Sequence, residues 1–471
     1  MPAEPRFVAL VTAGVTQEVA DALEAFIKDA SDAELGRINA PEFASKHNLP
    51  VSKVIDGLVS AAHVGILDMA WNVTCPGCGG VLDAGADLRS FTKDQYPCAL
   101  CAGSFEPTLD ELVEVTFSVS PTIRRLPLHD PDLLSYWDHW RYVYKSSALV
   151  IPEGEAWSEL CESLTIAEEP LSPGERLVLS IQLPPEFLIL FEEITHSSVF
   201  LEVQGPESRT RQELSVTYSQ GGTPHRTLTL QPGPARLTLE NRTNRRLLTG
   251  LFRANEALHQ MLARRRPFLT AKQVLTNQTF RNLFKADTLD VNQRIKISSI
   301  TVLFTDLKGS TALYERVGDL AAYDIVRKHF RVLGDVVSEH EGAVVKTIGD
   351  AVMATFPTPQ TGVAAALAMH SAMARFNAEQ QREELTVKIG LHEGSALAVS
   401  LNDRLDYFGQ TINIAARVQD LATATSLFTT EPVVLNPEVK RLFEQAHLSA
   451  RPRKALLKGI SEELTVYEIP L

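Results

Sequence analysis

The sequence has 471 residues, too many for one ordinary hydrophobic core, so we expect about two to four domains. Hydrophobic residues make up 44% and charged residues 22%, a balance typical of soluble globular proteins. The formal net charge of -13 argues against a general binder of nucleic acids or of anionic membranes.

No apolar run reaches the length that spans a bilayer, and the run from Phe7 to Gln17 lacks the flanks of a signal peptide. We therefore expect a cytoplasmic protein without a membrane partner. Of the five cysteines, four form two Cys-x-x-Cys pairs and Cys161 stands alone. In a reducing compartment this pattern favours metal binding over disulfides.

Residues 1–74 are predicted to form a winged-helix-like helical unit. One helix runs to His47, a turn follows through Asn48-Leu49-Pro50, and a second helix precedes an apolar strand that ends near Val73. The charges of residues 36–74 are balanced, with Arg37, Lys46 and Lys53 against Glu42, Asp56 and Asp68. Because no basic face results, a scaffold or protein-interaction role is favoured over DNA binding.

Residues 75–112 carry the cysteine pairs. Nineteen residues separate Cys75 and Cys78 from Cys98 and Cys101. This spacing is typical of a zinc ribbon, in which four thiolates hold one structural Zn2+ in a tetrahedron. The alternative is four thiols without a metal.

Residues 113–253 are predicted to form a β-rich, sandwich-like regulatory domain. Alternating or β-branched runs occur at 177–183, 199–203 and 235–240, and turn signals such as Ser172-Pro-Gly174 separate them. Residues 254–297 return to helical patterns and are predicted to be a helical linker to the last domain, 298–471.

The last domain begins with an apolar strand, 298–306, that ends in Asp306 and continues through Leu307-Lys-Gly309-Ser310-Thr311 to a helix. Asp306 offers oxygen ligands to a hard cation. The backbone N–H groups of 307–311 can face phosphate oxygens. Alternatively, the aspartate only caps the helix that follows.

Two further segments carry polar side chains in unusual places. Residues 342–354 are predicted to be a hairpin with Asp350 at its tip and Lys346 inside an apolar strand. Farther on, Asn413 and Arg417 are four residues apart at the start of a helix, so that they share one face. Each feature alone is compatible with an ordinary turn former or a solvated surface.

In this order the three segments resemble the catalytic domain of class III adenylate and guanylate cyclases, over the whole of 298–471. The resemblance implies an α+β, ferredoxin-like fold similar to the palm of polymerases. It also implies that Asp306 and Asp350, with the backbone of Leu307, hold two Mg2+ or Mn2+ ions. Lys346 and Asp406 would contact adenine, and Asn413 and Arg417 would act in the transition state. The candidates for triphosphate contacts are Gly309, Ser310, Thr311, Arg404 and Lys458, and the last two are equally compatible with surface charges.

Lys346 and Asp406 favour ATP as the substrate. Adenine offers a donor at N6 and an acceptor at N1, which suit a carboxylate and an ammonium, whereas guanine reverses that pattern at O6 and N1. The alternatives are a guanylate cyclase or a non-catalytic regulator that binds nucleotide or DNA. A diguanylate cyclase is not favoured, because the hairpin has Ile348-Gly-Asp-Ala351 in place of a glycine-glycine-acidic signature.

In this family each site takes the metal aspartates from one catalytic domain and the other four groups from a second. Because this chain has both sets in one domain, the resemblance implies a homodimer with two equivalent sites. The order of its parts also resembles bacterial cyclases whose middle region is a conserved domain of unknown function. We therefore expect residues 1–252 to respond to an unidentified ligand or protein and the linker to transmit that response.

Overall fold

A computed structural model describes residues 3–220, 226–284, 289, 294–309, 315–379, 385–401, 404–460 and 462–471. The chain divides into two compact units. The first comprises Met1–Ala86, Ser90–Pro107 and Leu112–Leu269, and the second comprises Asp87–Arg89, Thr108–Glu111 and Thr270–Leu471. Among the described helices, none combines the length and the apolar character needed to cross a bilayer.

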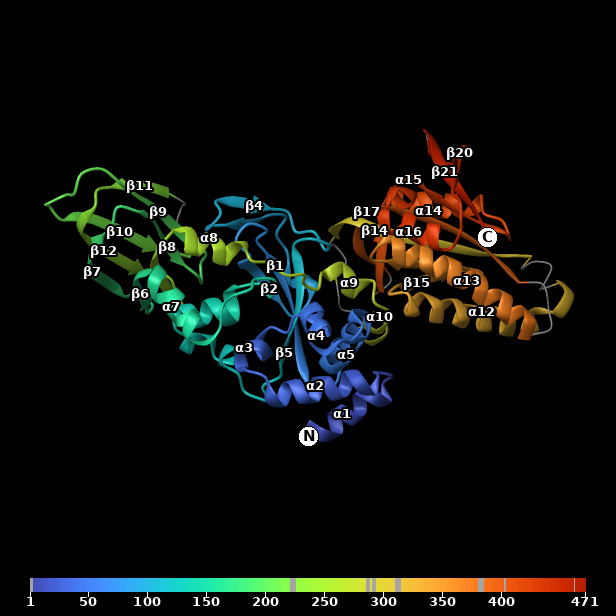
Figure 1. The fold of residues 1–471 in the computed structure, drawn as a ribbon, viewed down its shortest axis with the longest axis horizontal. Helices are drawn as coiled ribbons and strands as arrows, with labels where there is room; N and C mark the ends of the chain where they lie inside the picture. Colours follow the sequence, from blue (N-terminus) through green and yellow to red (C-terminus); the bar gives the residue numbers. More distant parts are fainter. Residues whose placement is uncertain are drawn as a thin grey trace. The chain divides into compact units, whose positions relative to one another are not determined.

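The first unit begins with helices and a small sheet (Figure 1). The side chain of Asn39 caps the fourth helix by accepting a hydrogen bond from Glu42 N, and Asn48 ends that helix in the left-handed conformation at φ 54°. The helices are α1 (Ala3–Thr12), α2 (Gln17–Asp29), α3 (Asp32–Gly36), α4 (Ala40–His47) and α5 (Val51–His63). The sheet has the order β2-β1-β5, with β1 Leu67–Thr74, β2 Val81–Gly85 and β5 Val113–Val119.

A β-rich region forms the rest of the first unit, which confirms the prediction of strands here. Its described residues form two sheets, with the orders β10-β12-β7 and β11-β9-β8-β13-β6. Buried side chains of both sheets, including Leu190, Leu201, Leu237 and Val216, form one apolar cluster. The strands are β6 (Thr165–Leu171), β7 (Arg176–Leu183), β8 (Phe187–Glu192), β9 (Ser197–Val203), β10 (Gln212–Tyr218), β11 (Arg226–Leu230), β12 (Gly233–Asn241) and β13 (Leu247–Arg253).

Short elements connect these parts of the first unit. The hairpin β3 (Tyr96–Cys98) and β4 (Gly103–Phe105) carries the second cysteine pair. The segment between β5 and β6 contains α6 (Tyr136–His139), the π-helical turn η4 (Trp140–Tyr144) and α7 (Gly154–Leu164). Helix α8 (Glu256–Ala263) follows β13.

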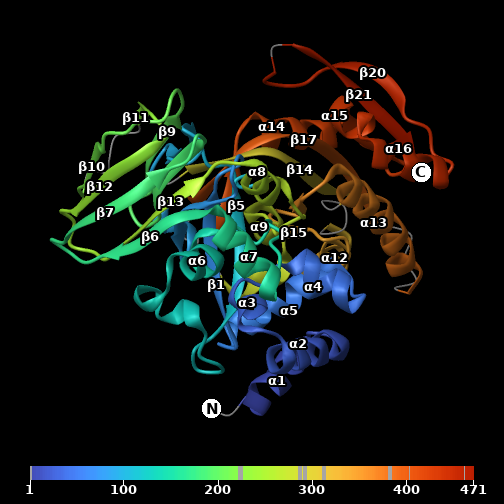
Figure 2. The same ribbon diagram turned by 60° about the vertical axis from the view of Figure 1, so that its left-hand side comes forward.

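The second unit is built on a sheet in the order β15-β16-β14-β17-β19-β21-β20, with β18 paired to β17. The chain order β14-α12-β15-β16-α13-β17 is the predicted ferredoxin-like βαββαβ arrangement. Helices α12 and α13 lie side by side in both views (Figures 1 and 2). The strands are β14 (Arg294–Lys308), β15 (Ala343–Ile348), β16 (Ala351–Phe356), β17 (Thr386–Leu401), β18 (Arg404–Phe408), β19 (Ser426–Thr430), β20 (Arg451–Leu456) and β21 (Glu463–Pro470).

Helices cover both faces of this sheet. Leu303 of β14 and Leu391 of β17 belong to the apolar cluster formed with α12 and α13. Gly390 faces the other way, toward α14, where a Cβ atom would come within 2.2 Å of the backbone N of Gln419. The helices are α12 (Asp319–Glu339), α13 (Pro359–Glu379), α14 (Gln410–Asp420), α15 (Glu431–Leu435) and α16 (Pro437–Gln445).

The predicted linker, 254–297, is divided between the two units. Its later helices, α9 (Ala271–Leu275) and α10 (Gln278–Leu283), belong to the second unit. Strand β14 begins at Arg294, earlier than predicted, because residues 294–297 continue the pairing with β17 beyond a bulge. The carboxylate of Asp110 stabilises that bulge by accepting hydrogen bonds from the backbone N of Ser298 at 2.9 Å and of Ser299 at 3.0 Å.

Candidate active site

Two aspartates lie together at one end of the central strands. Asp306 is near the end of β14, and Asp350 is in the turn between β15 and β16, where Gly349 has φ 63°. Strand β16 pairs with β14, and the backbone N of Val352 donates to Oγ1 of the buried Thr305 at 3.0 Å. The hairpin is therefore held with its tip beside Asp306.

The electrostatics of this end of the sheet suit a cation. Burial, and next the charge of Asp350, raise the pKa of Asp306, whereas Lys388 acts in the opposite direction. The Nζ of Lys388 lies 4.0 Å from Oδ2 of Asp306. Oδ2 of Asp350 is buried and has no hydrogen-bond partner among the described residues. Two neighbouring carboxylates, one with an unsatisfied buried oxygen, form a donor set that fits a divalent ion such as Mg2+ or Mn2+.

Lys346 and Asp406 contact each other directly. Lys346 lies on β15, just after a register shift in its pairing with β16, and Asp406 lies on β18. The Nζ of Lys346 is 2.5 Å from Oδ2 of Asp406, and the backbone N of Tyr407 donates to Oδ1 of Asp406 at 2.8 Å. The side chain of Lys346 is 41% exposed and that of Asp406 10% exposed. The pair thus places an ammonium and a carboxylate side by side, a hydrogen-bond donor next to an acceptor.

Asn413 and Arg417 lie on the exposed face of α14, as predicted from their spacing. The opposite face of this helix, with Ile414 and Val418, packs in an apolar cluster. Nη1 of Arg417 is 3.3 Å from Oδ2 of Asp420, which is also exposed. Among the described residues, no hydrogen bond or ion pair joins Asn413 or Arg417 to Asp306 or Asp350.

The structure describes some of the remaining metal and triphosphate candidates but not all of them. The side chain of Leu307 is buried in the core, so that only its backbone could serve a metal, and Gly309 is exposed with φ 82°. Ser310 and Thr311 lie outside the described residues. Arg404 is exposed at the start of β18, and Lys458 is exposed in the turn between β20 and β21.

Sequence reasoning missed two charged residues of this site. Lys388 is the cross-strand neighbour of Asp306, because the pairing of β14 with β17 places Asp306 opposite Lys388. Asp420 pairs with Arg417, and its charge also contributes to the raised pKa of Asp306, after burial and the charge of Asp350. The local signal for Lys388 was a lysine inside an apolar strand. Its partner, Asp306, could be found only from the register of the two strands.

Helices α9 and α10 are joined to the two strands that carry Lys346 and Asp406. Nη2 of Arg281 donates to the backbone O of Leu405 at 2.8 Å and to that of Val345 at 3.5 Å. The backbone N of Val344 donates to Oε1 of Gln278 at 2.8 Å. Tyr407 donates through its hydroxyl to the backbone O of Leu275 at 3.3 Å. A displacement of these helices would therefore act directly on both strands.

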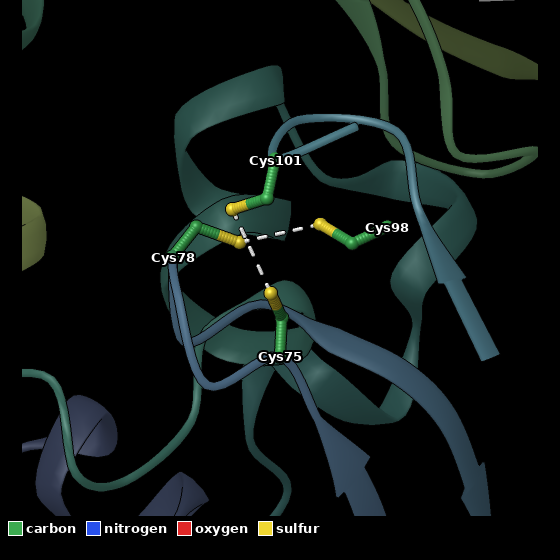
Figure 3. A group of neighbouring side chains, drawn as sticks. All are labelled: Cys75, Cys78, Cys98 and Cys101. Atoms are coloured by element: carbon green, nitrogen blue, oxygen red, sulfur yellow. Dashed lines mark hydrogen bonds between the residues drawn. The ribbon is translucent and has the colours of Figure 1, made fainter. Parts of the chain in front are cut away.

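The four paired cysteines converge in the first unit (Figure 3). Their sulfur atoms all lie within 4.8 Å of one another. Sγ of Cys75 is 3.6 Å from that of Cys101, and Sγ of Cys78 is 3.6 Å from that of Cys98. A tetrahedron with Zn–S bonds of about 2.3 Å requires sulfur separations of about 3.8 Å, so the arrangement fits Zn2+. At Gly77 a Cβ atom would come within 2.8 Å of the Cys101 sulfur.

Comparisons with known proteins match both parts of the chain. The model described as "Family of unknown function (DUF5939)" matches residues 2–282, and that of the "Adenylate and Guanylate cyclase catalytic domain" matches residues 293–469. The adenylate cyclase of Anabaena cylindrica is 28% identical over 185 residues, which cover 36% of this chain and 36% of that protein. Adenylate cyclase 2 of Rhizobium meliloti (strain 1021) is 31% identical over 130 residues, covering 25% and 36% respectively.

The chain therefore spans about a third of the length of these two curated relatives. Among solved structures, the adenylyl cyclase CyaB from P. aeruginosa aligns over 38% of this chain and 95% of that chain. The sequence identity of that alignment is 19% and its TM-score is 0.33.

Proposed function

Because the chain belongs to the family of unknown function DUF5939 and carries a class III adenylate and guanylate cyclase catalytic domain, we propose that it converts ATP into 3′,5′-cyclic AMP and pyrophosphate. One observation carries this proposal. Asp306 and Asp350 lie together at the strand ends, in the same unit as the contacting pair Lys346 and Asp406. The test is release of pyrophosphate from ATP by the purified full chain with Mn2+. No release from ATP, whether or not GTP reacts, contradicts the proposal.

The reaction is an in-line attack of the ribose 3′-hydroxyl on the α-phosphorus, with pyrophosphate as the leaving group. Asp306, Asp350 and the backbone of Leu307 would hold two divalent ions. Bound there, Mg2+ or Mn2+ supplies activation of the hydroxyl and neutralisation of the phosphate charge. Lys388 lies at 4.0 Å from Asp306 and would share that carboxylate with the metal.

Lys346 and Asp406 would select the base. Asp406 accepts from N6 of adenine and Lys346 donates to N1, so that both remain satisfied when the base replaces part of their mutual contact. A guanylate cyclase is the second candidate. The ammonium and carboxylate at these positions disfavour it, because guanine offers O6 and N1–H in the opposite sense.

Arg417 and Asn413 would act on the reacting phosphate and ribose. Arg417 stabilises the charge that develops on the pentavalent phosphorus, and Asn413 orients the ribose. Both side chains are exposed on α14 and none of the described contacts joins them to the aspartates of their own chain. This supports a homodimer in which each site combines the aspartates of one subunit with the other groups of its partner.

We expect Asn413→Ala to retain the KM for ATP while kcat falls by about tenfold to a thousandfold, because the amide acts mainly in the transition state. Steady-state kinetics of the purified variant measures both constants. The matched control is Gln410→Ala, since Gln410 is exposed on the same helix. A rise in KM with unchanged kcat would contradict this role for Asn413.

The cysteine cluster would hold one structural Zn2+, since four thiolates leave no open position for catalysis. We expect about one zinc per chain by elemental analysis, and loss of zinc with a lower unfolding temperature in Cys78→Ser. Cys161→Ser is the control, because Cys161 is a buried cysteine outside the cluster. Zinc well below one per wild-type chain would remove this assignment.

The N-terminal region would regulate the catalytic domain. Its winged-helix-like unit would serve as a scaffold or an interaction module, with DNA an unfavoured partner because its charges are balanced. Helix α9 and all but the last residue of α10 lie within the match to the family of unknown function, yet both helices form hydrogen bonds to the strands of Lys346 and Asp406. They would carry a change of the N-terminal region to the base-binding pair.

A further inference from the structure

A cavity of about 220 Å³ lies within the first unit, far along the sequence from every catalytic candidate. Its walls come from α2, α3 and α4, from η4 and the segment that follows it up to α7, and from Arg266 after α8. Five basic side chains line it, namely Arg37, Lys46, Arg141, Lys145 and Arg266. The acidic side chains of the lining are Glu34, Glu42 and Glu153.

Two of the five cations have carboxylate partners. Nζ of Lys46 lies 3.1 Å from Oε1 of Glu34 and 3.4 Å from Oε1 of Glu42. Arg266 forms an ion pair with Glu42. These two cations and two carboxylates balance one another, and Glu153 is exposed at the edge of the cavity.

Backbone carbonyl groups hold the guanidinium group of Arg37, but one of its nitrogen atoms has no hydrogen-bond acceptor among the described residues. Its Nε donates to the backbone O of Tyr142 at 3.2 Å, and its Nη2 donates to that of Val143. Its Nη1 is buried without a hydrogen-bond partner among the described residues, and so is Nε of Arg141. Two guanidinium groups therefore have buried N–H donors that no described group of the protein accepts.

Lys145 is the most deeply buried of the five cations. The residue is 8% exposed, and no described carboxylate forms an ion pair with it. Burial, and next the charges of Arg37 and Arg266, lower the pKa of Lys145 to about 7. The buried Glu114 opposes this shift; its Oε1 accepts from the backbone N of Ser147 at 2.9 Å, and its Oε2 has no hydrogen-bond partner among the described residues. One buried carboxylate thus stands against the charges of Arg37, Arg141 and Lys145, and an excess of buried positive charge is costly without a further anion.

We propose that Arg37, Arg141 and Lys145 form a binding site for a small oxyanion, a phosphoryl or carboxyl compound with at least two negative charges. The planar fork of each guanidinium matches the paired oxygens of such groups, and the ammonium supplies a third positive charge. At about 30 Å³ for each water molecule in the liquid, the cavity has the volume of roughly seven waters, which suits phosphate, pyrophosphate or a small polycarboxylate.

This site lies in the region that matches the family of unknown function, and it does not depend on the proposed cyclase activity. The test therefore measures binding. Inorganic phosphate, pyrophosphate and citrate are titrated separately into the full chain, in a buffer without added metal ions, and binding is measured by calorimetry. The unfolding temperature of the chain is then measured in the presence of each anion. The phosphate and citrate arms distinguish a phosphoryl from a carboxyl ligand.

The variants are Lys145→Met and Arg141→Met, which keep the length of the side chain and remove its charge. We expect at least one anion to bind the wild-type chain, and each variant to weaken that binding by about tenfold or more. Lys53→Met is the matched control, because Lys53 is exposed on α5 and pairs with Asp56 away from the cavity. It should leave the affinity unchanged.

Two results would overturn the assignment. One is that none of the three anions binds or raises the unfolding temperature of the wild-type chain. The other is that an anion binds with the same affinity to the wild type and to both cavity variants, which would place it elsewhere. If one variant fails to fold, as judged by its unfolding transition, the other still decides between these outcomes.

Discussion

Asp306→Ala and Arg417→Ala are each expected to lose cyclase activity by about a thousandfold or more, and an equimolar mixture of the two is expected to recover about a quarter of the wild-type activity. Random pairing makes about half of the dimers mixed. In a mixed dimer one site takes Asp306 from one subunit and Arg417 from the other, so that one of its two sites is intact.

The control for this experiment is a mixture of Asp306→Ala with Asp350→Ala. The two aspartates lie at the same strand ends of one chain and serve the same site. Every site of that mixed dimer therefore has one damaged aspartate, and no recovery is expected. Recovery in both mixtures, or in neither, would contradict a site shared between subunits.

Reversing the donor and the acceptor of the base-binding pair is expected to change the preferred nucleotide. Lys346→Glu with Asp406→Ser offers an acceptor and a donor in the sense that guanine requires. We expect kcat/KM for ATP to fall by about a hundredfold, and GTP to become the better substrate. The single variant Lys346→Glu should be poor with both nucleotides, because it brings a second carboxylate against the buried Asp406.

Kinetics with ATP and GTP, measured on the same preparations, test this expectation. Lys454→Glu is the control, since Lys454 is an exposed strand lysine of β20 with no place in the proposed site. If the double variant keeps the wild-type preference for ATP, Lys346 and Asp406 do not select the base.

The residues that could be predicted from the sequence share one property, which is that each belongs to a local motif. Asp350 is at a hairpin tip, the spacing of Asn413 and Arg417 defines a helix face, and the two cysteine pairs have the Cys-x-x-Cys spacing of a metal site. The ferredoxin-like order of β14 to β17 was instead implied by the resemblance to class III cyclases.

What the sequence could not provide depends on tertiary pairing. Lys388 meets Asp306 only through the register of β14 with β17. Asp110 comes from the cysteine-bearing segment and stabilises a bulge almost two hundred residues later, at Ser298 and Ser299. Helical periodicity also gave no sign that the linker is divided, because hydrogen bonds such as that of Arg281 to Leu405 assign its later helices to the catalytic unit.

The buried cations of the first unit could likewise not be predicted from the sequence. Arg37 contributed to the balance of charges in a helical segment, and Arg141 and Lys145 lie in a stretch without regular periodicity. Only the fold brings the three around one cavity and shows that Nη1 of Arg37 and Nε of Arg141 are buried without an acceptor among the described residues. A net charge summed over a segment therefore hides a local excess of positive charge.

Synthesis of cyclic AMP by this chain is tested most directly by the mass of the product. Purified full-length protein is incubated with Mn2+ and equal concentrations of ATP and GTP, and the nucleotides are identified by mass spectrometry. We expect 3′,5′-cyclic AMP as the main product, with an equal amount of pyrophosphate and little cyclic GMP. Cyclic GMP as the main product, or no cyclic nucleotide at all, would contradict it.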